Sequence, residues 1–200
     1  MKVSVRLPVL SDEEIIFRKQ IGVECVDLYL DVIPGYQKGV LPGFQTVRFD
    51  LNDVAKVIRK VKDSGLDVAS FYALPIRQAL LGHPEGEKQI EDLCEFIRLL
   101  GNESVEVAQV GLEEVRHGPT GVPGRYVREH RAGYKMYAFS LKLMREELAK
   151  RDLNACWAHH FRDSIKSEEY FSNCVKVLER VIPVAEDSNV KVAIHTDDPP

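Results

Sequence analysis

Short apolar segments alternate with amphipathic segments along most of the chain. Five segments rich in β-branched residues are predicted to be strands, at residues 2–7, 25–30, 66–74, 104–110 and 190–195. Alternation of strands with helices is typical of parallel βαβ units, in which each crossover carries a helix. The pattern therefore predicts an α/β protein built on a parallel sheet.

The helices are predicted from apolar residues three and four positions apart and from their capping residues. The motif Ser-Asp-Glu-Glu at 11–14 opens the first helix, which ends near Gly22. A second helix begins near Asp50 and ends at Gly65, and a third ends at Gly101. A fourth begins at Ser167 and carries a proline near its end.

Residues 111–135 interrupt this alternation with a glycine-, proline- and arginine-rich stretch, predicted to be a long loop within a lid-like insertion around 111–152. A helix is expected to follow, with Tyr137, Leu141, Met144 and Leu148 along one stripe. Residues 154–161 fit a short strand or a loop, and for His159 and His160 beside Trp157 a metal role and a purely structural role are both open. The basic residues of the insertion are either a solvated surface or a lid over a substrate; they are Arg116, His117, Arg125, Arg128, His130 and Arg131.

Composition excludes several classes of function. With a net charge of −4, 44% hydrophobic and 29% charged residues, the chain predicts a folded core and gives no electrostatic reason to bind nucleic acid. It contains neither the run of about 20 apolar residues that a membrane span needs nor a secretory signal. The four cysteines are Cys25, Cys94, Cys156 and Cys174, and no two of them form a CxxC pair. This spacing indicates reduced thiols, and we therefore expect a cytoplasmic protein.

Polar residues follow the ends of the predicted strands. They are Asp31, Arg77, Glu113, His195, Asp197 and Asp198. An open doubly wound sheet and a barrel both fit five parallel strands, but no G-x-G-x-x-G motif follows the first strand, so the barrel is favoured. A barrel places its active site at these strand ends. Because a complete barrel takes about 250 residues, we expect a barrel truncated after its fifth strand.

The last 26 residues, VKVLERVIPVAEDSNVKVAIHTDDPP, carry a specific resemblance. They are very similar to the segment of mannonate dehydratases in which a helix with IPVAEE precedes a strand and HPDDPP. Residues 22–30 and 65–82 resemble the second and third strands of that family more loosely. The resemblance implies an α/β (β/α)8 TIM barrel, xylose-isomerase-like, with residues 1–200 as a single partial catalytic domain.

The resemblance also implies an activity, the metal-dependent dehydration of D-mannonate to 2-keto-3-deoxy-D-gluconate in hexuronate (glucuronate) catabolism. It makes His195 a ligand of Mn²⁺, or of another divalent ion such as Fe²⁺ or Co²⁺, with the family's other ligands on later strands. Arg6 and Arg77 are then candidates for binding the sugar-acid carboxylate, and Asp197 and Asp198 for orienting the ligand or the substrate hydroxyls. The general base is not identified.

Each candidate also has a simpler interpretation. His195 can be a core histidine, the two aspartates turn formers, and the two arginines solvated surface residues. The sequence departs from the family at Thr196, Leu7, Pro8, Tyr72 and Arg77, which leaves open another sugar acid as substrate.

Alternatives to the dehydratase are a metal-dependent sugar isomerase or epimerase of the same barrel class and a non-catalytic remnant of such a barrel. We expect a homo-oligomer, and we expect the 200-residue chain alone to be inactive and prone to association.

Overall fold

The computed structural model describes residues 2–34, 50–73, 76–112, 124–150 and 165–195. The chain divides into two compact units. The first comprises Met1–Leu112 with Ser167–His195, and the second comprises Glu113–Lys166 with Thr196–Pro200. No helix in the described part of the chain has the length and apolar character needed to cross a bilayer.

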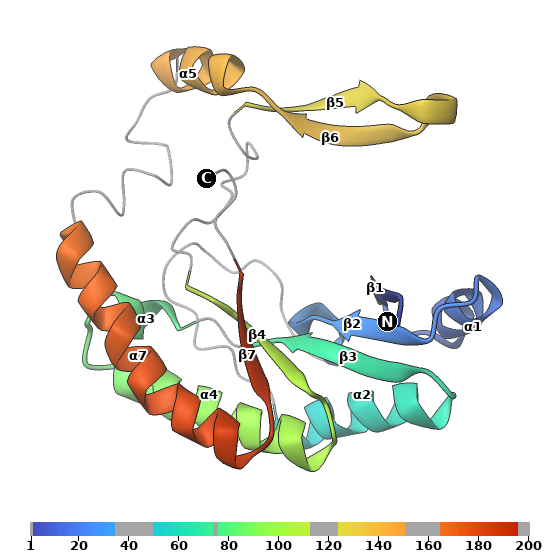
Figure 1. Ribbon diagram of the computed structural model, residues 1–200, viewed down its shortest axis with the longest axis horizontal. Helices are drawn as coiled ribbons and strands as arrows, with labels where there is room; N and C mark the ends of the chain where they lie inside the picture. Colours follow the sequence, from blue (N-terminus) through green and yellow to red (C-terminus); the bar gives the residue numbers. More distant parts are fainter. Residues whose placement is uncertain (1, 35–49, 74–75, 113–123, 151–164, 196–200) are drawn as a thin grey trace. The chain divides into compact units, whose positions relative to one another are not determined.

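The first unit is built on a five-stranded parallel sheet in which the strands follow one another in chain order (Figure 1). The strands are β1 (Ser4–Arg6), β2 (Cys25–Leu28), β3 (Asp67–Tyr72), β4 (Val107–Gly111) and β7 (Lys191–His195). Every neighbouring pair is parallel, so the C-terminal ends of all five strands lie at one edge. A doubly wound sheet reverses its strand order at a switch point. The uninterrupted order here is that of a barrel.

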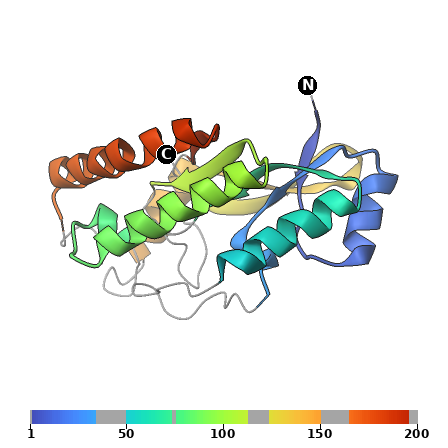
Figure 2. The ribbon, with the colours of Figure 1, turned by 90° about the horizontal axis from the view of Figure 1, so that it is seen from below.

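Helices cover one face of this sheet. They are α2 (Leu51–Asp63), α4 (Gly86–Asn102) and α7 (Ser167–Asp187), with α1 (Asp12–Gln20), the short α3 (Arg77–Leu80) and the 3-10 turn η1 (Leu30–Val32) completing the unit. From below, α2, α4 and α7 lie side by side across the strands (Figure 2). The rings of Phe71 on β3 and Phe96 on α4 meet edge to face at 5.3 Å and are fully buried. The helix-facing side of the sheet is therefore the apolar core.

The predicted helix starts are confirmed by their caps. The Ser11 hydroxyl accepts a hydrogen bond from the Glu14 backbone N–H at 3.2 Å, and the Asp50 carboxylate accepts one from the Asn52 N–H at 2.8 Å. Gly65 follows α2 with a φ of +86°, a left-handed conformation that favours glycine. Capping chemistry thus sets where the helices begin and end.

The second unit contains a hairpin that the sequence analysis missed. Strands β5 (Arg125–Glu129) and β6 (Lys135–Phe139) pair antiparallel around the turn η2 (Arg131–Gly133), and α5 (Leu141–Lys150) follows. The prediction of a loop to residue 135 was therefore wrong from Arg125 onward. The predicted helix is present but begins at Leu141, so Tyr137 is not part of it. Ala132 and Gly133 adopt positive φ and close a tight turn, and Tyr137 pairs with Val127 across the strands.

Several predicted strand boundaries also differ. The second strand stops at Leu28 because the chain turns into η1 at Leu30, and the fourth begins only at Val107 because Ser104 adopts a φ of +55°. The helix α3 was not predicted. Leu74 and residues 154–161 lie outside the described residues.

Candidate active site

The sheet face opposite the helices carries two groups of polar and aromatic side chains. The lower row is a group joined by hydrogen bonds, and each member of the upper row follows a member of the lower row by two residues along the chain. The lower row consists of Ser4, Asp27, Ser70 and Gln109, and the upper row of Arg6, Tyr29 and Tyr72. A (β/α)8 barrel carries its chemistry at this end.

The lower row is one chain of hydrogen bonds that ends on a carboxylate. Gln109 Nε2 donates to Ser70 Oγ at 2.5 Å, and Ser70 Oγ donates to Asp27 Oδ1 at 2.6 Å. From the other side, Ser4 Oγ donates to Asp27 Oδ2 at 2.7 Å. Since β1 to β4 each contribute one member, the row ties four strands together.

The upper row stacks a cation on two aromatic rings. The guanidinium carbon of Arg6 lies 4.1 Å from the Tyr29 ring centroid, and the Tyr29 and Tyr72 rings stack at 5.1 Å with planes 10° apart. Asp31, the first residue after Leu30, forms an ion pair with Arg6, with Nη2 and Oδ2 2.5 Å apart. The structure therefore brings the predicted Arg6 together with Asp31 and with two tyrosines.

The strand β7 ends at His195, on the side of the sheet where the other strands also end. β4 and β7 pair Gln109 with Ala193 and Gly111 with His195, so His195 lies two residues beyond the register position of Gln109. Its neighbour Gly111 has no side chain to fill that position. The predicted location of His195 at the rim shared by the strand ends is confirmed, whereas its role as a metal ligand stays a prediction.

Of the remaining predicted site residues, the structure describes Arg77. Arg77 is the first residue of α3, just beyond β3, and is half-buried. Asp197 and Asp198, like Glu113, lie outside the described residues. Substrate contacts by Arg77 and the two aspartates stay predictions.

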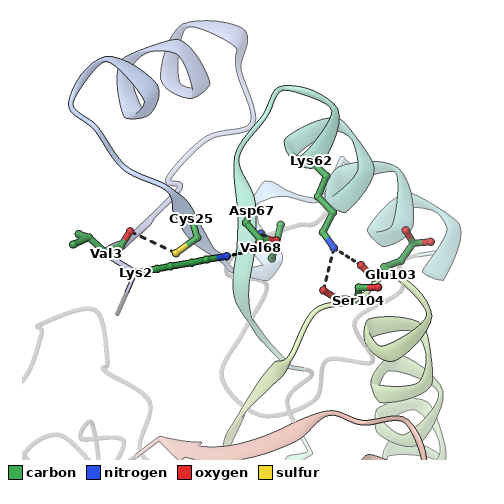
Figure 3. A network of polar contacts seen from close by, with 8 residues as sticks. All are labelled: Lys2, Val3, Cys25, Lys62, Asp67, Val68, Glu103 and Ser104. Carbon is green, nitrogen blue, oxygen red and sulfur yellow. Dashed lines mark hydrogen bonds and ion pairs between the residues drawn. The ribbon is translucent and has the colours of Figure 1, made fainter.

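At the opposite end of the sheet, where the strands begin, charged side chains pair with one another or with the backbone (Figure 3). Lys2 Nζ contacts Asp67 Oδ2 at 2.9 Å, and Lys62 Nζ donates to the Ser104 carbonyl at 3.0 Å. The hydrogen bond from Lys2, aided by the Val68 backbone N–H, lowers the pKa of Asp67, and the same bond raises the pKa of Lys2. Lys2, just before β1, is thus paired with β3, and Lys62 of α2 is paired with the turn that precedes β4.

The described residues do not form a metal site by themselves. Among them, no group of three or more His, Cys, Asp and Glu side chains is placed to hold a metal ion. The described residues therefore do not supply a full ligand set, and His195 can be at most one of several ligands.

Tyr29 of the upper row and all four members of the lower row were not predicted from the sequence. The four are Ser4, Asp27, Ser70 and Gln109. One signal was available, because Asp27 interrupts the otherwise apolar strand CVDL, and a charged residue within a parallel strand needs a partner. The partners, however, come from other strands, and only the folded structure identifies them.

Comparison with known proteins agrees with this architecture. A family model described as D-mannonate dehydratase (UxuA) matches residues 146–200. The mannonate dehydratase of Streptococcus suis (strain 05ZYH33) is 24% identical over 190 residues, covering 86% of this chain and 51% of that protein. The predicted resemblance to mannonate dehydratases is confirmed. The mannonate dehydratase of Thermotoga petrophila is 27% identical over 182 residues, covering 75% of this chain and 47% of its own length.

Solved structures support the fold in the same way. The crystal structure of mannonate dehydratase from Streptococcus suis serotype 2 matches 98% of this chain and 54% of its own chain, with a TM-score of 0.73 and 20% identity. A D-psicose 3-epimerase from Clostridium cellulolyticum H10 matches 96% of this chain and 51% of its own, with a TM-score of 0.50 and 10% identity. The (β/α)8 barrel class is confirmed. The chain spans about half the length of the curated mannonate dehydratases that it matches.

Proposed function

We propose that this chain carries part of the active site of a hydro-lyase that dehydrates a sugar acid, D-mannonate, to 2-keto-3-deoxy-D-gluconate. The observation that carries the proposal is the position of Arg6, an ion-paired and ring-stacked guanidinium at the same strand-end rim as His195. An arginine can bind a carboxylate through two parallel hydrogen bonds. The names of the similar proteins supply the substrate and reaction.

In this proposal Arg6 binds the substrate carboxylate and Arg77 assists it from the start of α3. His195 contributes one imidazole ligand, oriented with help from Asp197 and Asp198. When bound, Mn²⁺, or Fe²⁺ or Co²⁺, supplies the positive charge that stabilises the enediolate formed as the C2 proton leaves. A general base removes that proton and a general acid protonates the departing C3 hydroxyl; neither is assigned to a residue.

The reaction is tested by its product. The 200-residue chain alone is expected to give no 2-keto-3-deoxy acid. Joined to the remaining barrel strands and incubated with Mn²⁺ and D-mannonate, it should yield this acid, which a chemical assay for such acids detects. An epimerase or isomerase of the same barrel class would return an isomer of the substrate without loss of water. A sugar-binding remnant would give no product, and either outcome would refute the dehydratase.

The metal role of His195 has its own test. His195→Ala should lower both bound Mn²⁺ and turnover, because removing one of a few ligands sharply weakens binding. His83→Ala is the matched control, since His83 is exposed in the turn before α4 and its ring contacts Gln78. Equal Mn²⁺ content in the two variants would show that His195 is not a ligand.

The setting of the enzyme is part of the same proposal. In this proposal the enzyme acts in hexuronate breakdown and forms a homo-oligomer in the cytoplasm. The reducing cytoplasm fits three cysteines that are buried as free thiols, Cys25, Cys94 and Cys174. Sizing the protein by light scattering would test the oligomer.

A further inference from the structure

The side chain of Arg6 is held by its neighbours before any ligand arrives. Its Nη2 contacts Asp31, its guanidinium lies over the Tyr29 ring, and Tyr29 in turn stacks on Tyr72. These residues lie at or just beyond the C-terminal ends of β1, β2 and β3, which are hydrogen-bonded neighbours. The stack therefore spans three strand ends that the sheet itself holds in place.

The arginine nevertheless keeps hydrogen-bonding capacity. A guanidinium has five N–H donors, and among the described residues only Asp31 is recorded as accepting from Arg6. The Arg6 side chain is 47% exposed, whereas the Asp31 side chain is 17% exposed. One edge of the guanidinium is thus occupied by the protein, and further donors remain accessible.

From this geometry we infer that Tyr29 and Tyr72 are positioning residues, which hold the Arg6 guanidinium in one plane for the carboxylate of a small monoacid. The inference rests on the proposed function, in which Arg6 binds the substrate. A free arginine side chain loses rotamer freedom when it binds a ligand, and restraining it beforehand strengthens binding. Lysine has no planar group to stack, so it cannot replace arginine here.

The test replaces the ring under the arginine and compares it with a matched ring elsewhere. Tyr29→Leu removes the stack, and Tyr29→Phe keeps the ring. Phe17→Leu is the control, because the Arg18 guanidinium lies 5.1 Å from the Phe17 ring centroid and Arg18 is likewise ion-paired, with Glu14. That second cluster is on α1, away from the strand ends.

The expected readout is a split between binding and turnover. In the Mn²⁺-loaded protein that includes the remaining barrel strands, Tyr29→Leu should raise the KM for D-mannonate about tenfold and leave kcat within about twofold. Tyr29→Phe and Phe17→Leu should keep the wild-type KM. Tyr72→Leu should raise KM in the same direction, and it also replaces Tyr29→Leu if that variant does not fold.

Direct binding separates this inference from the proposed function. By calorimetry Tyr29→Leu should bind D-mannonate about tenfold more weakly than the wild type does. If the wild type binds D-mannonate and Tyr29→Leu weakens this binding, but no 2-keto-3-deoxy acid forms, the proposed function fails and the inference stands. If product forms and Tyr29→Leu keeps the wild-type KM and affinity, the inference is overturned. Equal weakening by Phe17→Leu would overturn it as well.

Discussion

Replacing Asp27 by alanine should destabilise the protein by about 3 kcal/mol, because Asp27 is the common acceptor of the lower polar row. Its two oxygens accept from Ser4 at 2.7 Å and from Ser70 at 2.6 Å. Hydrogen bonds to charged groups contribute about 1.5–3 kcal/mol each, and removing a half-buried carboxylate returns part of that through lost desolvation. The Ser70 hydroxyl, on a residue only 5% exposed, would then lack an acceptor for its proton.

Two further variants separate the charge from the hydrogen bonds. Asp27→Asn keeps the shape and one acceptor oxygen, so we expect a loss of about 1 kcal/mol. Ser70→Ala, added to Asp27→Ala, removes the stranded hydroxyl as well. The double variant should therefore be more stable than the sum of the two single losses predicts, by about 1–2 kcal/mol.

The assay is urea unfolding followed by far-ultraviolet circular dichroism, with the wild type and all variants compared at one pH and equal denaturant slopes. Ser4→Ala is a control for a partner that is only half-buried, and it should cost less than Ser70→Ala. Strict additivity of Asp27→Ala and Ser70→Ala would refute the reasoning. A loss of less than about 0.5 kcal/mol for Asp27→Ala would also refute it.

Three other predictions test separate parts of the fold. Gly101→Ala should lower the urea midpoint, since a Cβ there would lie 2.4 Å from the backbone oxygen of Ser188. This clash should outweigh the gain in helix propensity of about 1 kcal/mol. An unchanged midpoint would contradict the close approach. Burial raises the pKa of the Cys94 thiol, so iodoacetamide should label it slowly at pH 8 in the folded protein and rapidly in urea; comparable rates would argue against its burial. The Lys2 hydrogen bond lowers the pKa of Asp67, so its contribution to stability is present above the unfolded pKa of about 3.9 and is lost as pH falls through the lower folded pKa. Lys2→Met should flatten this acid-limb dependence, and an identical pH profile would show that the pair is unimportant.

The fold was predictable where local chemistry determines it. The Ser11 and Asp50 caps and the five apolar strand segments follow from residue type and spacing, and the structure has them in parallel order. The β5–β6 hairpin was not predictable in the same way. Its turn depends on Ala132 in a conformation that alanine rarely adopts, and the alternation in β5 is masked by arginines.

The site was predictable only in part. Arg6 and His195 could be selected because the resemblance to mannonate dehydratases singles them out, and their residue types suit carboxylate and metal binding. Tyr29 could not, because its meaning depends on stacking with a tyrosine from the next strand in the sheet. Such pairings arise from the register between strands, which the sequence of one strand does not contain.

The division of the sheet into an apolar face, a hydrogen-bonded lower row and an upper row has a consequence for engineering. The upper-row side chains of Arg6, Tyr29 and Tyr72 are each partly accessible, whereas Phe71 on the helix-facing side has no accessible surface. A combinatorial library at positions 6, 29 and 72 should therefore alter ligand preference while most members keep the wild-type melting temperature. The same library at position 71 and its neighbours on α4 would yield mostly unfolded chains.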